Sequence, residues 1–274
     1  MNYLDYWGLQ DKPFEDTRNP RFFFESSRHS EALARLCYLA RDGNMRFGLL
    51  TGEIGSGKTL TATMLRNYLD ALGYDVIYIE NADIPFNAIV TEIICELRSD
   101  ATYLNIPDRY RLMREFKRLV KEPDRNNVVV ILDEAQQLSM KSLAQLRNLT
   151  NVDFEERGCV TIIMVGQPEL RQMVTAIPQL DQRIALRFHL RPLRCEDVDR
   201  YLRFRMSRSG HADGRIFEEA ASDIISRETG GVPRTINRIA RLAVDHAYAV
   251  AADRVTCDIV KKICADMKEQ ALLN

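Results

Sequence analysis

The sequence predicts an α/β protein in which helices flank a five-stranded parallel sheet and a helical lid follows at the C-terminus. Three observations support this fold class. Apolar, strand-like runs alternate with amphipathic stretches through the first two thirds of the chain, as in parallel sheets. A glycine-rich turn separates the first strand from its helix. After Pro192 the strand-like runs stop, and only helical periodicity continues.

The individual elements follow from hydrophobic periodicity. The expected strands cover residues 47–51, 75–80, 128–132, 160–165 and 186–190. The expected helices of the sheet domain cover residues 28–42, 58–72, 85–98, 108–121, 141–151 and 168–176, and those of the lid cover 195–209, 216–228, 233–251 and 256–270. We therefore expect an α/β domain at residues 1–192 and a helical lid domain at 193–274.

The composition is that of an ordinary globular protein. Of 274 residues, 46% are hydrophobic and 28% are charged, and the formal net charge of −1 argues against binding nucleic acid by bulk charge. No apolar run reaches the roughly 18 residues of a membrane-spanning helix, and no secretory signal pattern opens the chain. We expect a cytoplasmic chain. The six cysteines and four histidines are scattered, which predicts neither disulfides nor a zinc site.

The glycine-rich turn matches the phosphate-binding loop G-x-x-x-x-G-K-[ST]. It consists of Gly52, Glu53, Ile54, Gly55, Ser56, Gly57, Lys58 and Thr59, and Leu60 follows it in the helix. Glycines allow the tight turn that points backbone N–H groups at phosphates. Lys58 is expected to reach the β- and γ-phosphates, and the Thr59 hydroxyl to hold Mg²⁺. The loop therefore predicts binding of ATP with magnesium.

Two carboxylates follow the buried strand expected at 128–132. Asp133 is expected to hold Mg²⁺, usually through water, and Glu134 to polarise the attacking water. An Asp-Glu pair at a strand end is by itself consistent with a merely solvated edge. With a phosphate loop upstream, the pair predicts hydrolysis.

Further polar residues have two interpretations each. Gln167, at the end of the fourth strand, is a candidate for orienting water, or a cap for the helix that follows. Arg183 and Arg187 precede or begin the last strand, and either could act as an arginine finger in a neighbouring subunit or pair with Asp181 at the surface. Arg234, at the start of a lid helix, could reach the γ-phosphate.

Taken together, these features resemble an AAA+ ATPase, and further motifs resemble the ExeA-type family, also called general secretion pathway protein A. The motifs cover nearly the whole chain. They are Tyr6-Trp7-Gly8-Leu9, Lys12-Pro13-Phe14, Arg21-Phe22-Phe23-Phe24, Leu132-Asp133-Glu134-Ala135-Gln136-Gln137-Leu138, Leu146-Arg147-Asn148-Leu149-Thr150-Asn151, Val165-Gly166-Gln167-Pro168-Glu169-Leu170 and Gly231-Val232-Pro233-Arg234-Thr235-Ile236-Asn237.

The resemblance implies an adenine pocket in the N-terminal segment 1–45, near Pro13, Phe14 and His29. The aromatic residues there are equally consistent with packing the N-terminus on the sheet. The resemblance also implies assembly into a ring or filament, with Arg183 as the better finger candidate. Members of the family usually continue into a membrane-spanning segment, whereas this sequence ends after the lid. We therefore expect an ATPase core, cytoplasmic or peripheral at the inner membrane, that works through a membrane-associated protein partner.

Three functions fit these residues. The first is an ATPase that couples its assembly to secretion, pilus or export machinery. The second is a DNA-bound adaptor, because the core also resembles transposition regulators of the TnsC and TniB kind. The third is a nucleotide-gated switch with negligible turnover. DNA contact is suggested by a basic stripe on the helix expected at 108–121, although acidic neighbours also fit a solvated face. The stripe consists of Arg111, Arg114, Arg118 and Lys121, and the acidic neighbours are Glu115 and Glu122.

Overall fold

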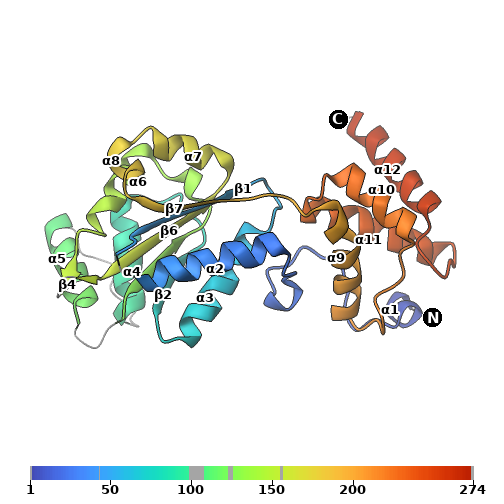
Figure 1. Cartoon of the computed structure of the whole chain (residues 1–274), viewed down its shortest axis with the longest axis horizontal. Coiled ribbons are helices and arrows are strands. Elements are labelled where there is room, and N and C mark those ends of the chain that lie inside the picture. Colours follow the sequence, from blue (N-terminus) through green and yellow to red (C-terminus); the bar gives the residue numbers. More distant parts are fainter. Residues whose placement is uncertain (1, 43, 99–107, 123–125, 155–156, 273–274) are drawn as a thin grey trace. The chain divides into compact units, whose positions relative to one another are not determined.

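The computed structural model describes residues 2–42, 44–98, 108–122, 126–154 and 157–272 (Figure 1). Residue contacts divide the chain into two compact units. The sheet unit contains residues 29–54 and 58–190, and the helical unit contains residues 1–28, 55–57 and 191–274. The first 28 residues thus group with the C-terminal helices, whereas the sequence had placed them with the sheet. Each unit is described by itself.

The sheet unit contains a five-stranded parallel sheet, which confirms the predicted fold class. Its strands are β1 (Phe47–Gly52), β2 (Asp75–Ile79), β3 (Val128–Leu132), β6 (Val160–Gly166) and β7 (Ile184–Leu190). Their order is β2-β3-β6-β1-β7, and each neighbouring pair is parallel. Strand β6 therefore lies between the strand that leads into the glycine-rich turn and the strand that ends at Asp133.

Helices cover both faces of this sheet (Figure 1). On one face, α2 (Ser27–Asp42) and α3 (Lys58–Ala71) pack against alternate strand residues such as Val129 and Ile131. On the other face, Val128 and Val130 belong to a cluster with residues of the remaining helices of this unit. Those are α4 (Phe86–Arg98), α5 (Arg109–Val120), α6 (Met140–Gln145), α7 (Pro168–Thr175) and α8 (Pro178–Asp181). A strand buried on both faces has no polar positions, which explains the continuous apolar run of β3.

The structure differs from the sequence reading mainly in short elements. Helix α6 ends at Gln145, and a 3-10 turn (η3, Leu146–Asn148) follows in place of a helix to residue 151. Leu143, Leu146 and Leu149 are nevertheless all buried. Residues three apart share a face in both helix types, so periodicity does not distinguish them. Also unpredicted were α1 (Tyr3–Trp7), η1 (Pro20–Phe22), η2 (Ala135–Gln137), α8 and the antiparallel pair β4 (Asp153–Phe154) and β5 (Arg157–Gly158).

The helical unit is built from four longer helices and the N-terminal segment. The helices are α9 (Cys195–Arg208), α10 (Glu219–Thr229), α11 (Pro233–Ala249) and α12 (Cys257–Leu272). Trp7, Leu9 and Phe14 are buried in the same apolar cluster as residues of these helices. Between α10 and α11, Gly231 has φ of +79°, and an added Cβ would lie 2.1 Å from the carbonyl oxygen of Leu193. Glycine is therefore required at this break. Within the described residues, no helix combines the length and apolar character needed to cross a bilayer.

One buried arginine joins the N-terminal segment to α9. Arg205 is 3% exposed, and its Nε donates to the carbonyl oxygen of Pro13 at 2.5 Å. Its Nη2 donates to the carbonyl oxygen of Glu15 at 2.7 Å, and its guanidinium carbon lies 4.5 Å from the centre of the Phe22 ring. A buried guanidinium needs such acceptors, since an unpaired one would be strongly destabilising. These contacts explain why residues 1–28 belong to the helical unit.

Candidate functional site

The predicted polar residues come together at the carboxyl edge of the sheet. In the parallel register, Thr51 of β1 pairs with Gly166 of β6, and Leu132 of β3 pairs with Met164. The residues that follow β1, β3 and β6 therefore lie at one edge. This is the edge where open α/β sheets bind their ligands.

The glycine-rich turn has the backbone conformation of a phosphate cradle. Gly55 and Gly57 have φ of +79° and +97°, a region that favours glycine. Lys58 is the first residue of α3, and its Nζ donates to the carbonyl oxygens of Gly52 at 2.8 Å and Glu53 at 2.9 Å. An ammonium group, a helix N-terminus and glycine N–H groups are the chemistry that binds phosphate. The residues present therefore fit the phosphates of a nucleotide.

Asp133 is held in place by two hydrogen bonds. The carboxylate is 1% exposed, and its Oδ2 accepts from the Tyr78 hydroxyl at 2.8 Å. Its Oδ1 accepts from the backbone N–H of Glu134 at 2.9 Å. Tyr78, on the neighbouring strand β2, was not singled out from the sequence. Its role depends on the pairing of β2 with β3, which no local pattern reveals.

The chemistry of the site also fits magnesium. Among the described residues there is no group of three or more His, Cys, Asp or Glu side chains that could hold a metal by themselves. Mg²⁺ is usually held by one or two protein oxygens together with waters and phosphate oxygens. The Thr59 hydroxyl and the Asp133 carboxylate would supply these protein oxygens.

Glu134 has an unusual backbone conformation. Its φ and ψ are 51° and 36°, in the left-handed region that residues other than glycine rarely adopt. Its Oε2 accepts from the side-chain Nε2 of Gln136 at 2.6 Å. Strained residues of this kind concentrate at functional sites, where surrounding contacts hold them. Gln136 was not predicted as a site residue, although it stands two residues after Glu134 in a motif noted in the sequence.

Gln167 does not use its side chain to cap a helix. It occupies the N-cap position of α7, but its side chain makes no capping hydrogen bond. Its backbone N–H donates to Oε1 of Gln136 at 3.1 Å. Of the two interpretations, the capping one lacks its hydrogen bond, and the water-orienting role remains a prediction.

The two candidate finger arginines have different partners. Arg187 donates to the carboxylate of Asp181 at 2.8 Å, which is the surface pair considered from the sequence. Arg183 Nη1 instead lies 2.6 Å from Oδ1 of Asn151, a neutral acceptor. In the part of the chain that the structure describes, Arg183 forms no ion pair. Its Nη1 also lies 3.4 Å from the carbonyl oxygen of Arg147 and 3.5 Å from Oγ1 of Thr150.

The remaining predicted residues lie in different units. In the helical unit, Arg234 Nε is 3.6 Å from Oδ2 of Asp16, and its backbone N–H donates to the Gly55 carbonyl oxygen at 3.3 Å. Phe14 is 3% exposed and meets Phe217 edge to face at 5.8 Å. Pro13 is held through its carbonyl by Arg205, as described above. His29 is buried near the start of α2 in the sheet unit. Phe14 thus serves the core of the helical unit, and adenine contact by these residues remains a prediction.

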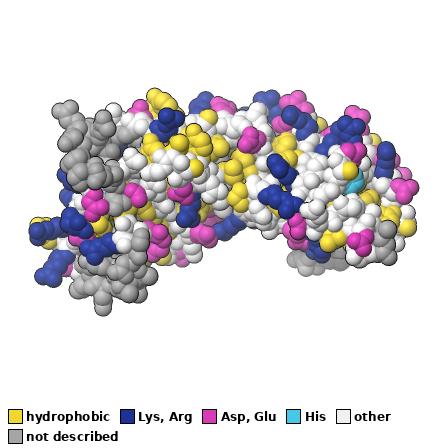
Figure 2. Space-filling view, turned by 90° about the horizontal axis from the view of Figure 1, so that it is seen from below, with side chains coloured by type: hydrophobic (Ala, Val, Ile, Leu, Met, Phe, Trp, Pro, Cys, Tyr) yellow, Lys and Arg dark blue, Asp and Glu magenta, His cyan; other side chains and the backbone are white. Residues whose placement is uncertain are grey.

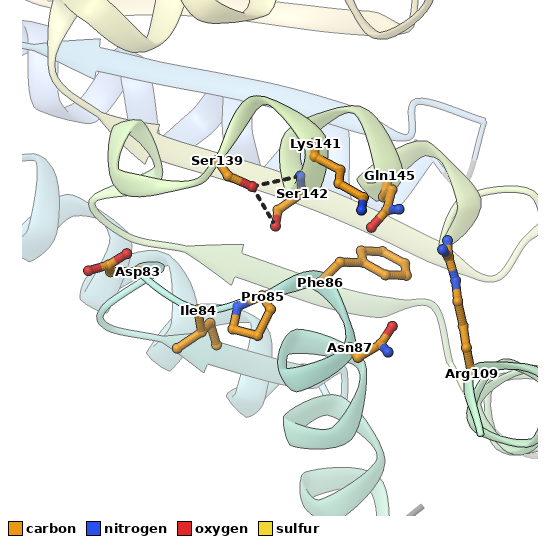
Figure 3. A pocket seen from close by; sticks show the side chains of 10 residues that line it. All are labelled: Asp83, Ile84, Pro85, Phe86, Asn87, Arg109, Ser139, Lys141, Ser142 and Gln145. Atoms are coloured by element: carbon orange, nitrogen blue, oxygen red, sulfur yellow. Dashed lines mark hydrogen bonds between the residues drawn. The ribbon is translucent and has the colours of Figure 1, made fainter. Parts of the chain in front are cut away.

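A separate concavity of the sheet unit was not predicted. It has a volume of about 510 Å³ and lies beside the first turns of α4, α5 and α6 (Figure 3). Phe86, Arg109, Ser139 and Lys141 contribute to its lining, and the Arg109 guanidinium lies 5.4 Å from the centre of the Phe86 ring. None of the site residues predicted from the sequence lines it.

Comparisons with known proteins agree with this geometry. A family model described as an AAA domain matches residues 41–174. The general secretion pathway protein A of Aeromonas hydrophila is 37% identical over 259 residues, which cover 92% of this chain and 46% of that protein. The chain belongs to the ExeA-type AAA+ ATPases. The resemblance noted in the sequence is confirmed.

Solved structures support the AAA+ fold. The Aeropyrum pernix ORC2 protein, solved as ADPNP-ADP complexes, superposes with a TM-score of 0.69 at 22% identity, over 93% of this chain and 71% of that one. Cdc6p from Pyrobaculum aerophilum superposes with a TM-score of 0.69 at 18% identity, over 90% of this chain and 68% of that one. At these identities the likeness concerns the fold alone.

Proposed function

We propose that this AAA+ ATPase binds ATP with Mg²⁺ at the carboxyl edge of its sheet and hydrolyses it. The observation that carries the proposal is the convergence of Lys58, Asp133 and Glu134 at the ends of β1 and β3, which flank β6. An ammonium group, a buried carboxylate and a strained second carboxylate serve phosphate binding, cation binding and water activation, respectively.

The proposal assigns a separate chemical role to each residue of the site. The loop from Gly52 to Leu60 and the Lys58 ammonium bind the phosphates, while Thr59 and Asp133 hold the cation. Bound Mg²⁺ neutralises charge on the phosphate oxygens. Glu134 accepts a proton from the attacking water, and Gln167 orients that water. Because phosphoryl transfer needs mainly positioning and charge stabilisation, these groups suffice for hydrolysis.

Lys58→Ala is expected to weaken ATP binding by about 10- to 100-fold, since it removes a charge-assisted hydrogen-bond donor worth about 1.5–3 kcal/mol. Titration calorimetry with ATP and Mg²⁺ measures the change. Lys141→Ala, on α6 and outside the loop, is the matched control and should bind as the parent does. Unchanged affinity in Lys58→Ala would contradict the assignment of the loop.

We further propose that the chain assembles into a ring or filament and serves a secretion or export system through a membrane-associated partner. The support is the 37% identity to a general secretion pathway protein A, of whose length this chain spans 46%. In the host, a strain that carries only Glu134→Gln is expected to lose export as a deletion strain does. Normal export in that strain would contradict this role.

A second candidate function is ATP-dependent DNA binding, and the surface of α5 favours it. Its apolar residues Leu112, Phe116, Leu119 and Val120 are all buried. The opposite side exposes cations, and Figure 2 shows Lys and Arg side chains gathered at the left of the view, where Figure 1 places α5. These exposed cations are Arg109, Arg111, Arg114, Lys117, Arg118 and Lys121.

Two members of the basic stripe form ion pairs among the described residues. Arg111 Nε lies 4.0 Å from Oδ2 of Asp108, and both of these side chains are exposed. Arg118 pairs with Glu115 at 3.0 Å and with Glu122 at 3.4 Å. Hydrogen bonds from Arg118 and then from Arg98 lower the pKa of Glu115, so this carboxylate stays ionised and keeps Arg118 occupied. Arg114 and Lys121 form no ion pair among the described residues, and the long, exposed pair of Arg111 leaves its guanidinium accessible to phosphate.

The DNA hypothesis predicts that the triple variant Arg111→Gln/Arg114→Gln/Lys121→Gln binds a labelled duplex more weakly than its parent. The salt dependence of log K should also become shallower by about one per lost phosphate contact. Fluorescence anisotropy in a Glu134→Gln background, with ATP and with ADP, measures both. The control neutralises Arg200, Arg215 and Lys261 in the helical unit. Absence of binding by the parent at low salt would exclude this function.

A further inference from the structure

The carboxylate proposed to activate water is held by a side chain that also contacts the next strand. Gln136 lies in the 3-10 turn η2, directly after Glu134 and Ala135. Its Nε2 donates to Oε2 of Glu134 at 2.6 Å, and its Oε1 accepts from the backbone N–H of Gln167 at 3.1 Å. One amide thus joins Glu134, the second residue after β3, to Gln167, the first residue after β6.

Chemistry at both ends defines the orientation of this amide. The backbone N–H of Gln167 can only donate, so the atom that faces it must be the amide oxygen. The other atom is then nitrogen, and it faces a carboxylate, which can only accept. Both contacts are within hydrogen-bonding distance, and the one to the carboxylate is charge-assisted.

The structure makes room for this bridge at Gly166, the last residue of β6. A Cβ at Gly166 would lie 2.5 Å from Oε1 of Gln136 and 2.8 Å from Cδ2 of Leu170. The φ of Gly166 lies outside the left-handed region, so its backbone conformation does not require glycine. A side chain at position 166 would instead have to displace the Gln136 amide and the end of Leu170.

We propose that Gln136 is a positioning residue that orients the Glu134 carboxylate and couples it to Gln167. This inference rests on the hydrolytic function proposed above and adds a residue to it. Glu134 has a strained backbone, and the hydrogen bond from Gln136 holds its side chain in one direction. Because Gln167 is bonded to the same amide, a shift of Gln167 at the phosphate would be transmitted to the water-activating carboxylate.

Two substitutions at position 136 separate the two hydrogen bonds. Gln136→Glu keeps an acceptor for the Gln167 N–H but replaces the donor to Glu134 by a like charge. Gln136→Leu removes both bonds. For Gln136→Leu we expect kcat to fall by about 10- to 100-fold with KM for ATP within twofold, as for a misplaced catalytic group. For Gln136→Glu we also expect kcat to fall with KM for ATP within twofold, because a carboxylate at position 136 cannot donate a hydrogen bond to Glu134.

Hydrogen exchange of the Gln167 amide provides a readout that does not depend on turnover. This amide is expected to exchange at least tenfold faster in Gln136→Leu than in the parent, and at the parental rate in Gln136→Glu. Slow exchange of β3 and β6 amides shows that each variant is folded. Gly166→Ala displaces Gln136 without altering it and should reproduce the loss of kcat. Its control is Gly48→Ala on β1, where an added Cβ would meet Leu39 at 3.3 Å.

The outcomes separate this inference from the proposed function. A parent without ATP turnover would refute hydrolysis, and the exchange experiment would still test the bridge. Parental kcat in Gln136→Leu, or a loss of ATP binding as large as the loss of turnover, would overturn the positioning role. Equal exchange of the Gln167 amide in all variants would overturn the coupling.

Discussion

Replacing Glu134 with glutamine is expected to lower ATP turnover by about 10²- to 10⁴-fold, the usual contribution of a positioned general base. Glutamine has nearly the same shape and still offers an oxygen to the Nε2 of Gln136, 2.6 Å away in the parent. It cannot accept a proton from water. ATP binding should therefore persist, and ATP-bound oligomers should accumulate.

Steady-state turnover, nucleotide affinity and light scattering measure these three effects on the same protein. Glu169→Gln is a matched control, because Glu169 is an exposed carboxylate near the start of α7. It should behave as the parent. Parental turnover in Glu134→Gln would refute the role of Glu134 as the base.

Arg183→Ala is expected to lower turnover by about 10³-fold if Arg183 enters the site of a neighbouring subunit, since an arginine finger contributes about 10³–10⁵. Arg183 has no carboxylate partner among the described residues, whereas Arg187 is paired with Asp181 at 2.8 Å. Arg187→Ala is therefore the control, and it should retain most activity. ATP affinity should be unchanged in both variants.

Mixing distinguishes action across subunits from action within one. A Lys58→Ala subunit has an intact Arg183 but a defective loop, and an Arg183→Ala subunit has the reverse. Where the two alternate in an oligomer, some sites combine an intact loop with an intact arginine, so the mixture should recover part of the turnover. If no ratio of the two inactive variants restores activity, the finger assignment is wrong.

The longer helices and strands were predicted because their buried positions form a recognisable apolar pattern in the sequence. The residues of β3 are all buried, and its apolar run indicated a central strand. Short elements such as α8, which has four residues, carry too little periodicity to be recognised. The N-terminal segment was placed with the sheet because its aromatic residues show only that they are buried, and not which core contains them. Arg205, far along the chain, decides that question.

Residues of the candidate site could be proposed from the sequence where they lie in one contiguous motif. They could not be proposed where their contacts join two separate segments. Lys58, Thr59, Asp133 and Glu134 lie in contiguous patterns, so their roles were proposed from local sequence. Tyr78 and Gln136 instead make hydrogen bonds to residues that follow neighbouring strands, at 2.8 Å to Asp133 and 3.1 Å to Gln167. The Tyr78 contact depends on the order of the strands in the sheet. The Gln136 contact depends on the absence of a side chain at Gly166.

The anchoring of Pro13 and Glu15 by Arg205 links the segment around these two residues to helix α9 in evolution. A change of backbone course in the first residues would deprive a buried guanidinium of its acceptors, and loss of the arginine would release those residues. We therefore expect the segment around Pro13 and helix α9 to be exchanged between relatives only together. A recombination event that exchanged one without the other would produce a mismatched helical unit.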